Sequence, residues 1–273
     1  MNEFITRTVW GALFVVTILG ALIMGSYSFL ILFLILSVFV LREFYTLCHN
    51  AGFSPQVYPG LIFGAIVFLV SFLVANNYLT SRSFLYLLPL IYALLIYELF
   101  RKKKNPLANI ALTSFGIIYV TIPFSLLNFL AFPTSEVSPQ YTNILLISLF
   151  IFVWTSDSGA YLFGVRFGRH RLFERISPKK SWEGLLGGLI SAIGAAWALS
   201  GIFTQYSFLF LGILAIVVVI SGTLGDLVES MIKRSIGVKD SGRFMPGHGG
   251  LLDRFDSILL ASPMIYFVLQ FLR

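Results

Sequence analysis

Residues 230–256 read SMIKRSIGVKDSGRFMPGHGGLLDRFD, and they separate the apolar runs VVVISGTL at 217–224 and SILLASPMIYFVLQFL at 257–272. This polar stretch holds five of the chain's 19 Lys and Arg residues and three of its 12 carboxylates. Apolar runs like those beside it recur along the whole chain and indicate helices that cross a membrane. We therefore expect the chemistry of this protein to lie in the polar stretch, at a membrane surface.

The composition excludes a soluble globular protein. Of the 273 residues, 58% are hydrophobic and 11% are charged, whereas soluble domains are about 45–50% apolar and about 25% charged. So few charges could not cover a water-facing surface of this size, which predicts an integral membrane protein. The single cysteine, Cys48, excludes an internal disulfide framework and a zinc site built from several cysteines.

The apolar runs predict an all-α, polytopic membrane bundle of about nine transmembrane helices. A span needs about 20 mostly apolar residues, and the first run, at 8–25, is too long for a cleaved signal peptide. Only helices or closed barrels satisfy the backbone in lipid, and these runs are continuous rather than alternating. The predicted spans are 8–25, 28–47, 57–76, 84–100, 109–132, 143–165, 184–204, 207–228 and 257–272.

The positive charges predict the orientation of this bundle. With the N-terminus and the even-numbered loops on one side, 17 of the 19 Lys and Arg residues fall on that side. The other side has only Arg82 and Arg273. Because cytoplasmic loops carry the Lys and Arg excess, we expect the N-terminus to be cytoplasmic.

The two halves of the chain differ in their acidic residues. Residues 1–150 contain four of the 12 carboxylates, and residues 151–256 contain the other eight. We therefore expect an N-terminal set of membrane helices at 1–140, which embeds the protein and offers dimer contacts. A catalytic region with cytoplasmic loops follows at 141–273. The basic run RKKKN at 101–105 is interpreted as a topology signal or a contact with anionic lipid.

Acidic side chains enter the predicted spans of the second half. Asp157 lies inside one span, where an ionisable residue costs about 2.5–3.5 kcal/mol and is functional by default. A contact with polar headgroups at the helix end is the alternative. Asp226, Ser230 and Lys233 lie at i, i+4 and i+7 and share one helix face, with an Asp–Lys pair inside the helix as the alternative.

Asp253 and Asp256 are spaced i and i+3 at the start of the last predicted helix, so their carboxylates point the same way. Together with Asp226 they predict an acidic cluster just inside the cytoplasmic face. Carboxylates this close repel one another unless a cation neutralises them. Oxygen ligands without a Cys or His pair favour Mg²⁺ or Mn²⁺ over zinc.

Two segments suit phosphate. In SPKKS at 177–181, Ser181 can cap the following helix, which places Lys179 and Lys180 beside a helix N-terminus. The glycine-rich PGHGG at 246–250 leads directly into another helix N-terminus. We interpret His170, which is flanked by arginines, as a solvated loop residue. Positive charge near the glycine turn comes from Lys233, Arg234, Lys239 and Arg243.

These motifs resemble the signature of the phosphatidate cytidylyltransferase (CDP-diacylglycerol synthase) family, in its bacterial form. In outline the signature reads S-x-x-K-R-x4-K-D and, after a short gap, P-x-H-G-G-x-x-D-R-x-D. DSGAY at 157–161, SPKKSWEG at 177–184 and GDLVES at 225–230 are also similar to that family. The N-terminal half resembles it only as a run of membrane helices. The matching fixed positions are Ser230, Lys233, Arg234, Lys239, Asp240, Pro246, His248, Gly249, Gly250, Asp253, Arg254 and Asp256.

The resemblance implies that CTP and phosphatidic acid give CDP-diacylglycerol and pyrophosphate with Mg²⁺. It also implies a homodimer in the bacterial cytoplasmic (inner) membrane, with the active site on the cytoplasmic face and no nucleic-acid partner. A second, monovalent cation is left open. We expect catalytic roles for Asp226, Asp253, Asp256, Lys233, Lys239 and His248, with the three aspartates as metal ligands. Substrate binding is expected at Ser177, Lys179, Lys180, Ser181, Arg234, Asp240, Gly249, Gly250, Arg254 and Asp157.

Two other classes are compatible with acids in a membrane bundle. A secondary transporter has its acids near the midplane and broken helices in matched positions of both halves, but here the acids gather in one half. CDP-alcohol phosphotransferases and polyprenyl transferases also use aspartate-bound Mg²⁺. They carry patterns such as D-x3-D or D-D-x-x-D, whereas this chain has DRFD and no adjacent aspartates.

Overall fold

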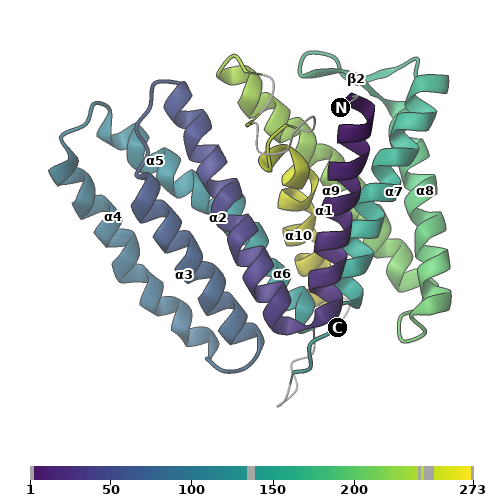
Figure 1. The fold of residues 1–273 in the computed structure, drawn as a ribbon, viewed down its shortest axis with the longest axis horizontal. Coiled ribbons are helices and arrows are strands. Elements are labelled where there is room, and N and C mark those ends of the chain that lie inside the picture. The colour runs from purple at the N-terminus through teal and green to yellow at the C-terminus, as the bar shows by residue number, and fades with distance from the viewer. Residues whose placement is uncertain (1–2, 134–138, 239–240, 243–248, 272–273) are drawn as a thin grey trace. The chain divides into compact units, whose positions relative to one another are not determined.

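The computed structural model describes residues 3–133, 139–238, 241–242 and 249–271, which are almost entirely helical (Figure 1). The two strands within these ranges have three and five residues. The all-α fold class is thus confirmed. The helices are α1 (Glu3–Met24), α2 (Ser26–Asn50), α3 (Val57–Ala75), η1 (Ser81–Leu87), α4 (Leu88–Arg101), α5 (Pro106–Gly116), η2 (Ile117–Thr121), α6 (Ile122–Ala131), α7 (Ile144–Phe167), α8 (Trp182–Ile202), α9 (Phe208–Ser235) and α10 (Leu252–Phe271).

Each predicted span coincides with a helical run, and seven of the described runs are long and apolar enough to cross a membrane. The protein is therefore an integral membrane protein with several spans. The N-terminal helix contributes the shorter apolar segment Thr8–Met24, and α10 is not among the seven. A count of nine spans and a cytoplasmic N-terminus stay predictions.

The chain forms two compact units, and the first comprises Met1–Asn143 and Ile236–Arg254. Here α2, α3 and α4 lie side by side (Figure 1). The buried Glu98 carboxylate on α4 accepts hydrogen bonds from the side chains of Gln56, Arg101 and Asn109, at 2.7, 2.7 and 2.9 Å. Polar groups buried in a membrane bundle need such partners, so this network ties α4 to α5 and to the start of α3.

The second unit comprises Ile144–Ser235 and Phe255–Arg273. An antiparallel hairpin of β1 (Arg171–Phe173) and β2 (Ser177–Ser181) connects α7 to α8, and Figure 1 shows the two helices side by side with β2 at one end. The hairpin was not predicted, because His170 was placed in a loop and no strand was expected beside it. The division of function between 1–140 and 141–273 stays a prediction.

Small residues let α7 and α8 approach closely. A Cβ atom on Gly188 would lie 3.0 Å from the carbonyl oxygen of Ser156, and one on Gly184 would lie 3.0 Å from that of Ala160. A Cβ on Gly159 would lie 2.7 Å from the carbonyl oxygen of Gly187. Without a hydrophobic driving force in lipid, such close backbone packing is a main source of helix association.

Gly159→Ala is therefore expected to destabilise the protein by about 1–3 kcal/mol, because the new methyl group overlaps backbone atoms of α8. The matched control is Gly194→Ala on α8, where a Cβ meets nothing within 4 Å. Alanine favours a helix over glycine by about 1 kcal/mol, so the control should not lose stability. Thermal unfolding in detergent measures the difference, and equal midpoints for both variants would contradict this packing.

Candidate functional site

Three acidic side chains form a cluster in the second unit. Within the residues that the structure describes, Asp226 and Glu229 of α9 and Asp256 of α10 each offer a carboxylate oxygen, all within 4.8 Å of one another. Glu229 is 1% exposed. Such a group of hard oxygen donors can hold a divalent cation such as Mg²⁺, Mn²⁺ or Ca²⁺.

Glycines on α9 set the distance between these carboxylates. A Cβ on Gly225 would overlap the backbone carbonyl oxygen of Asp256, and one on Gly222 would lie 3.3 Å from the Cβ of Ser257. The backbones of α9 and α10 therefore touch at this level, and Asp256 lies against the turn of α9 that carries Asp226.

Two lysines neutralise part of the cluster. The Lys180 Nζ lies 2.5 Å from Asp226 Oδ2 and also donates to the carbonyl oxygen of Thr223 at 3.3 Å. The buried Lys233 Nζ lies 2.8 Å from Glu229 Oε2. The alternative of an Asp226–Lys233 pair inside α9 is thus wrong, because Lys233 pairs with Glu229 and Asp226 pairs with Lys180. Ser230, which shares the Asp226 face as predicted, donates its hydroxyl to Asp226 Oδ1 at 3.2 Å.

The end of β2 and the start of α8 bring the predicted SPKKS motif to this cluster. Ser181 has extended backbone angles, and its hydroxyl accepts the Gly184 N–H at 3.1 Å, so the predicted helix cap is confirmed. The exposed His170 places its Nδ1 2.6 Å from Glu183 Oε1 in the first turn of the same helix. His170 therefore pairs with an acid rather than remaining only solvated.

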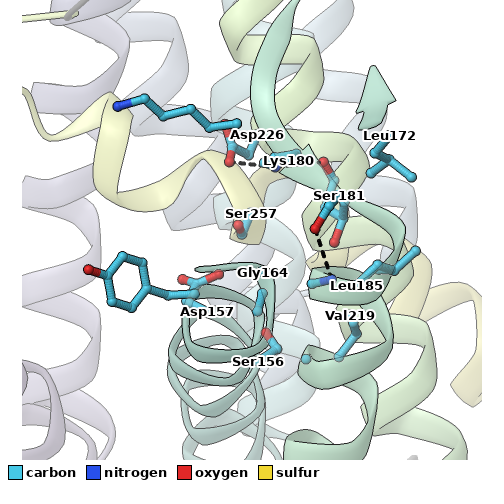
Figure 2. A pocket seen from close by; sticks show the side chains of 16 residues that line it. Ser156, Asp157, Gly164, Leu172, Lys180, Ser181, Leu185, Val219, Asp226 and Ser257 are labelled. Carbon is cyan, nitrogen blue, oxygen red and sulfur yellow. Dashed lines mark hydrogen bonds and ion pairs between the residues drawn. The ribbon is translucent and has the colours of Figure 1, made fainter. Parts of the chain in front are cut away.

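A cavity of about 340 Å³ opens beside these residues. Figure 2 shows Asp226, Lys180 and Ser181 around it. Asp157 of α7 and Lys179 of β2 also line it. The cavity thus collects carboxylates, ammonium groups and a capped helix N-terminus, which together suit a cation and phosphate groups.

Other predicted site residues belong to the first unit. Asp253 Oδ2 accepts the backbone N–H groups of Ser241 and Gly250, at 3.0 and 2.9 Å. Gly249 has φ +86°, a conformation that strains any L side chain. The Gly250 N–H donates to Asp253, so a contact between Gly250 and phosphate stays a prediction. Metal binding by Asp253 also stays a prediction.

The remaining predicted residues are distributed as follows. Ser177 begins β2, and the exposed Arg234 and Arg254 lie in the last turn of α9 and the first turn of α10. Their substrate contacts stay predictions. Lys239, Asp240 and His248 lie outside the described residues, as do Arg243 and Pro246.

Glu229 was missed as a candidate ligand by sequence reasoning. It lies three residues after Asp226 in GDLVES, and this i, i+3 spacing places both acids on one helix face. The i, i+3 spacing that pairs Asp253 with Asp256 also applies to Asp226 and Glu229. The sequence therefore contained the signal for Glu229, but only Ser230 and Lys233 were considered on the face of Asp226.

Known proteins resemble this chain over nearly its full length. A model of the cytidylyltransferase family matches residues 5–272. The phosphatidate cytidylyltransferases of Staphylococcus saprophyticus and Staphylococcus haemolyticus are each 33% identical to it, with 96% of this chain and 98% of each relative covered. The phosphatidate cytidylyltransferase of Haemophilus influenzae is 46% identical over 134 residues, 46% of this chain and 45% of the relative.

Asp226→Asn and Asp256→Asn are each expected to weaken binding of a divalent cation at least about tenfold, since even residues behind the ligands contribute that much. Electron paramagnetic resonance of Mn²⁺ titrated into detergent-solubilised protein measures free and bound ion. Glu174→Gln, in the exposed turn of the hairpin, is the control and should bind as the unmodified protein does. Unchanged Mn²⁺ affinity in both aspartate variants would contradict the assignment.

Proposed function

The chain belongs to the cytidylyltransferase family, and we propose that it transfers the cytidylyl group of CTP to phosphatidic acid. The products are CDP-diacylglycerol and pyrophosphate. The protein is an enzyme, a nucleotidyltransferase of phospholipid biosynthesis. The substrates follow from the names of relatives that match 96% of this chain and from the chemistry of the cavity.

The observation that carries this proposal is the meeting of Asp226, Lys180 and Ser181 at one cavity. Lys180 and the N-terminus of α8 can bind phosphate oxygens, while the acidic cluster can hold a cation. A nucleoside triphosphate complexed with a divalent cation needs both. A receptor or scaffold would not need three carboxylates held together in this way.

The donor set fits Mg²⁺. We propose that Asp226 and Asp256 hold it, with Glu229 as the third carboxylate of the described cluster, and Asp253 remains part of the proposed ligand set from the signature. When bound, the cation would neutralise the phosphate charge that builds up during transfer. Carboxylates from neighbouring helices give oxygen ligands without the soft donors that zinc prefers.

The reaction needs no covalent enzyme intermediate. A phosphate oxygen of phosphatidate forms a bond to the α-phosphorus of CTP as the bond from that phosphorus to the β-phosphate bridging oxygen breaks, and pyrophosphate leaves. Lys179 and Lys180 would bind and orient the nucleotide phosphates, and Lys233 and Arg234 would support the lipid phosphate or pyrophosphate. Positioning of this kind provides most of the rate in phosphoryl transfer.

We also propose that the site faces the cytoplasm in a bacterial inner membrane and that the enzyme is a homodimer. CTP is a cytoplasmic metabolite, and a lipid phosphate already lies at headgroup level. The basic residues of the hairpin and of the last turn of α9 support the cytoplasmic assignment through the Lys and Arg excess of cytoplasmic loops.

Purified protein in detergent is expected to form CDP-diacylglycerol from CTP and phosphatidic acid, to stop on addition of EDTA and to recover with excess Mg²⁺. Asp226→Asn and Asp256→Asn should lower kcat/KM by about 10²-fold or more, because each removes charge stabilisation at the reacting phosphates. Labelled CTP with chromatography of the lipid product measures the rate.

Glu174→Gln again serves as the control and should retain full activity. Full activity of both aspartate variants would refute the assignment of the cluster to the reaction. Incorporation of ATP, GTP or UTP as readily as CTP would refute the proposed nucleotide.

The orientation can be tested with single cysteines in a Cys48→Ser background. A membrane-impermeant maleimide added to intact cells should label a cysteine at Tyr78, between α3 and η1, but not one at Glu174 in the hairpin. Both positions are exposed. Permeabilised cells provide the control, in which both must react, and labelling of Glu174→Cys in intact cells would contradict the proposed topology.

A further inference from the structure

Glu43 lies on α2, in the half of the chain that carries none of the family motifs. Its Oε2 atom accepts the backbone N–H of Leu252 at 2.8 Å and the hydroxyl of Ser241 at 3.4 Å. Leu252 is the first residue of α10. A single carboxylate from the N-terminal helices thus binds the beginning of the helix on which Asp253 and Asp256 lie.

Glycines of the motif region fit closely around this carboxylate. A Cβ on Gly242 would lie 2.7 Å from Glu43 Oε1, and a Cβ on Gly250 would lie 2.6 Å from Glu43 Oε2. No other residue type fits at either position without displacing the carboxylate. The Gly250 of the signature therefore has a steric reason to be glycine, apart from any contact with substrate.

Asp253 completes the arrangement from the other side. Its carboxylate accepts the N–H groups of Ser241 and Gly250, whereas Glu43 accepts the Leu252 N–H and the Ser241 hydroxyl. Two carboxylates thereby bind three backbone N–H groups and a hydroxyl. Hydrogen bonds to ionised acceptors are roughly twice as strong as neutral ones, so they hold Gly250 and Leu252 firmly.

We propose that Glu43 is a positioning residue for cytidylyl transfer, which fixes the Gly250 turn and the first turn of α10. Its role is to orient the acidic residues of that helix without touching the reacting atoms. This inference rests on the proposed function, because it assumes that those residues act in the reaction. If Glu43 only stabilised the fold, its loss would lower activity only as far as it lowers the amount of folded protein.

Hydrogen–deuterium exchange of the detergent-solubilised protein tests the contact itself. Glu43→Ala is expected to speed amide exchange at Gly250 and Leu252, while Arg42→Ala, the exposed neighbour on α2, should leave it unchanged. Equal exchange in Glu43→Ala and the unmodified protein would overturn the proposal.

Kinetics test the positioning role. Glu43→Ala should lower kcat about 10- to 100-fold, since small misplacements of reacting groups cost this much, with little change in the KM for CTP. Glu43→Gln should recover part of the loss because its amide oxygen can still accept the Leu252 N–H. Thermal midpoints and size-exclusion profiles of all variants identify any unfolded protein.

The result expected is a fall in the kcat of protein that remains folded, with partial rescue by glutamine. The proposal would be overturned if folded Glu43→Ala had the same kcat as the unmodified protein. It would also be overturned if activity fell only in proportion to the amount of folded protein. If the unmodified protein makes no CDP-diacylglycerol while Glu43→Ala still speeds exchange at Leu252, the proposed function fails and the contact stands.

Discussion

Mutual repulsion of Asp226, Glu229 and Asp256 is the constraint on which the second unit depends. Their oxygens lie within 4.8 Å of one another, an arrangement that is costly unless positive charge compensates it. Lys180 and Lys233 supply part of that charge through ion pairs of 2.5 and 2.8 Å. The hairpin matters for the same reason, because β2 carries Lys180 to α9. Because two lysines offset only two of the three carboxylate charges, the cluster is suited to binding a further cation.

Carboxylates elsewhere in the chain, including the proposed ligand Asp253, accept hydrogen bonds from side-chain or backbone N–H groups. Glu98 accepts three side-chain hydrogen bonds within the first unit. Glu43 and Asp253 accept backbone N–H groups around Gly250. Each of these acids has nitrogen donors that match its charge or its lone pairs. Asp226 and Asp256 also have donors, in Lys180 and the Ser257 N–H, but in addition they lie close to each other and to Glu229. A group of carboxylates this close is suited to binding a cation.

Hydropathy was sufficient to locate the membrane helices, because each predicted span coincides with a helical run. The cap of α8 at Ser181 was predictable because capping is a local interaction. The β1–β2 hairpin was missed because its strands are three and five residues long and mostly polar. Glu43 was missed because its partners Ser241 and Leu252 lie 198 and 209 residues away, and no periodicity reports such a contact. The pairing of Lys180 with Asp226 is long-range for the same reason.

The small residues between α7 and α8 link the stability of the unit to the shape of its cavity. Ala160, Gly164, Gly184 and Gly188 line the cavity. At Gly184 and Gly188 the backbone of α8 also lies close to the backbone of α7 at Ala160 and Ser156. A larger side chain at these glycines would push the helices apart and fill the space beside Lys180 at once. Volume for a ligand and close helix packing thus have one physical cause, the absence of side-chain atoms. Substitutions that place larger side chains at these glycines should therefore impair folding and substrate binding together.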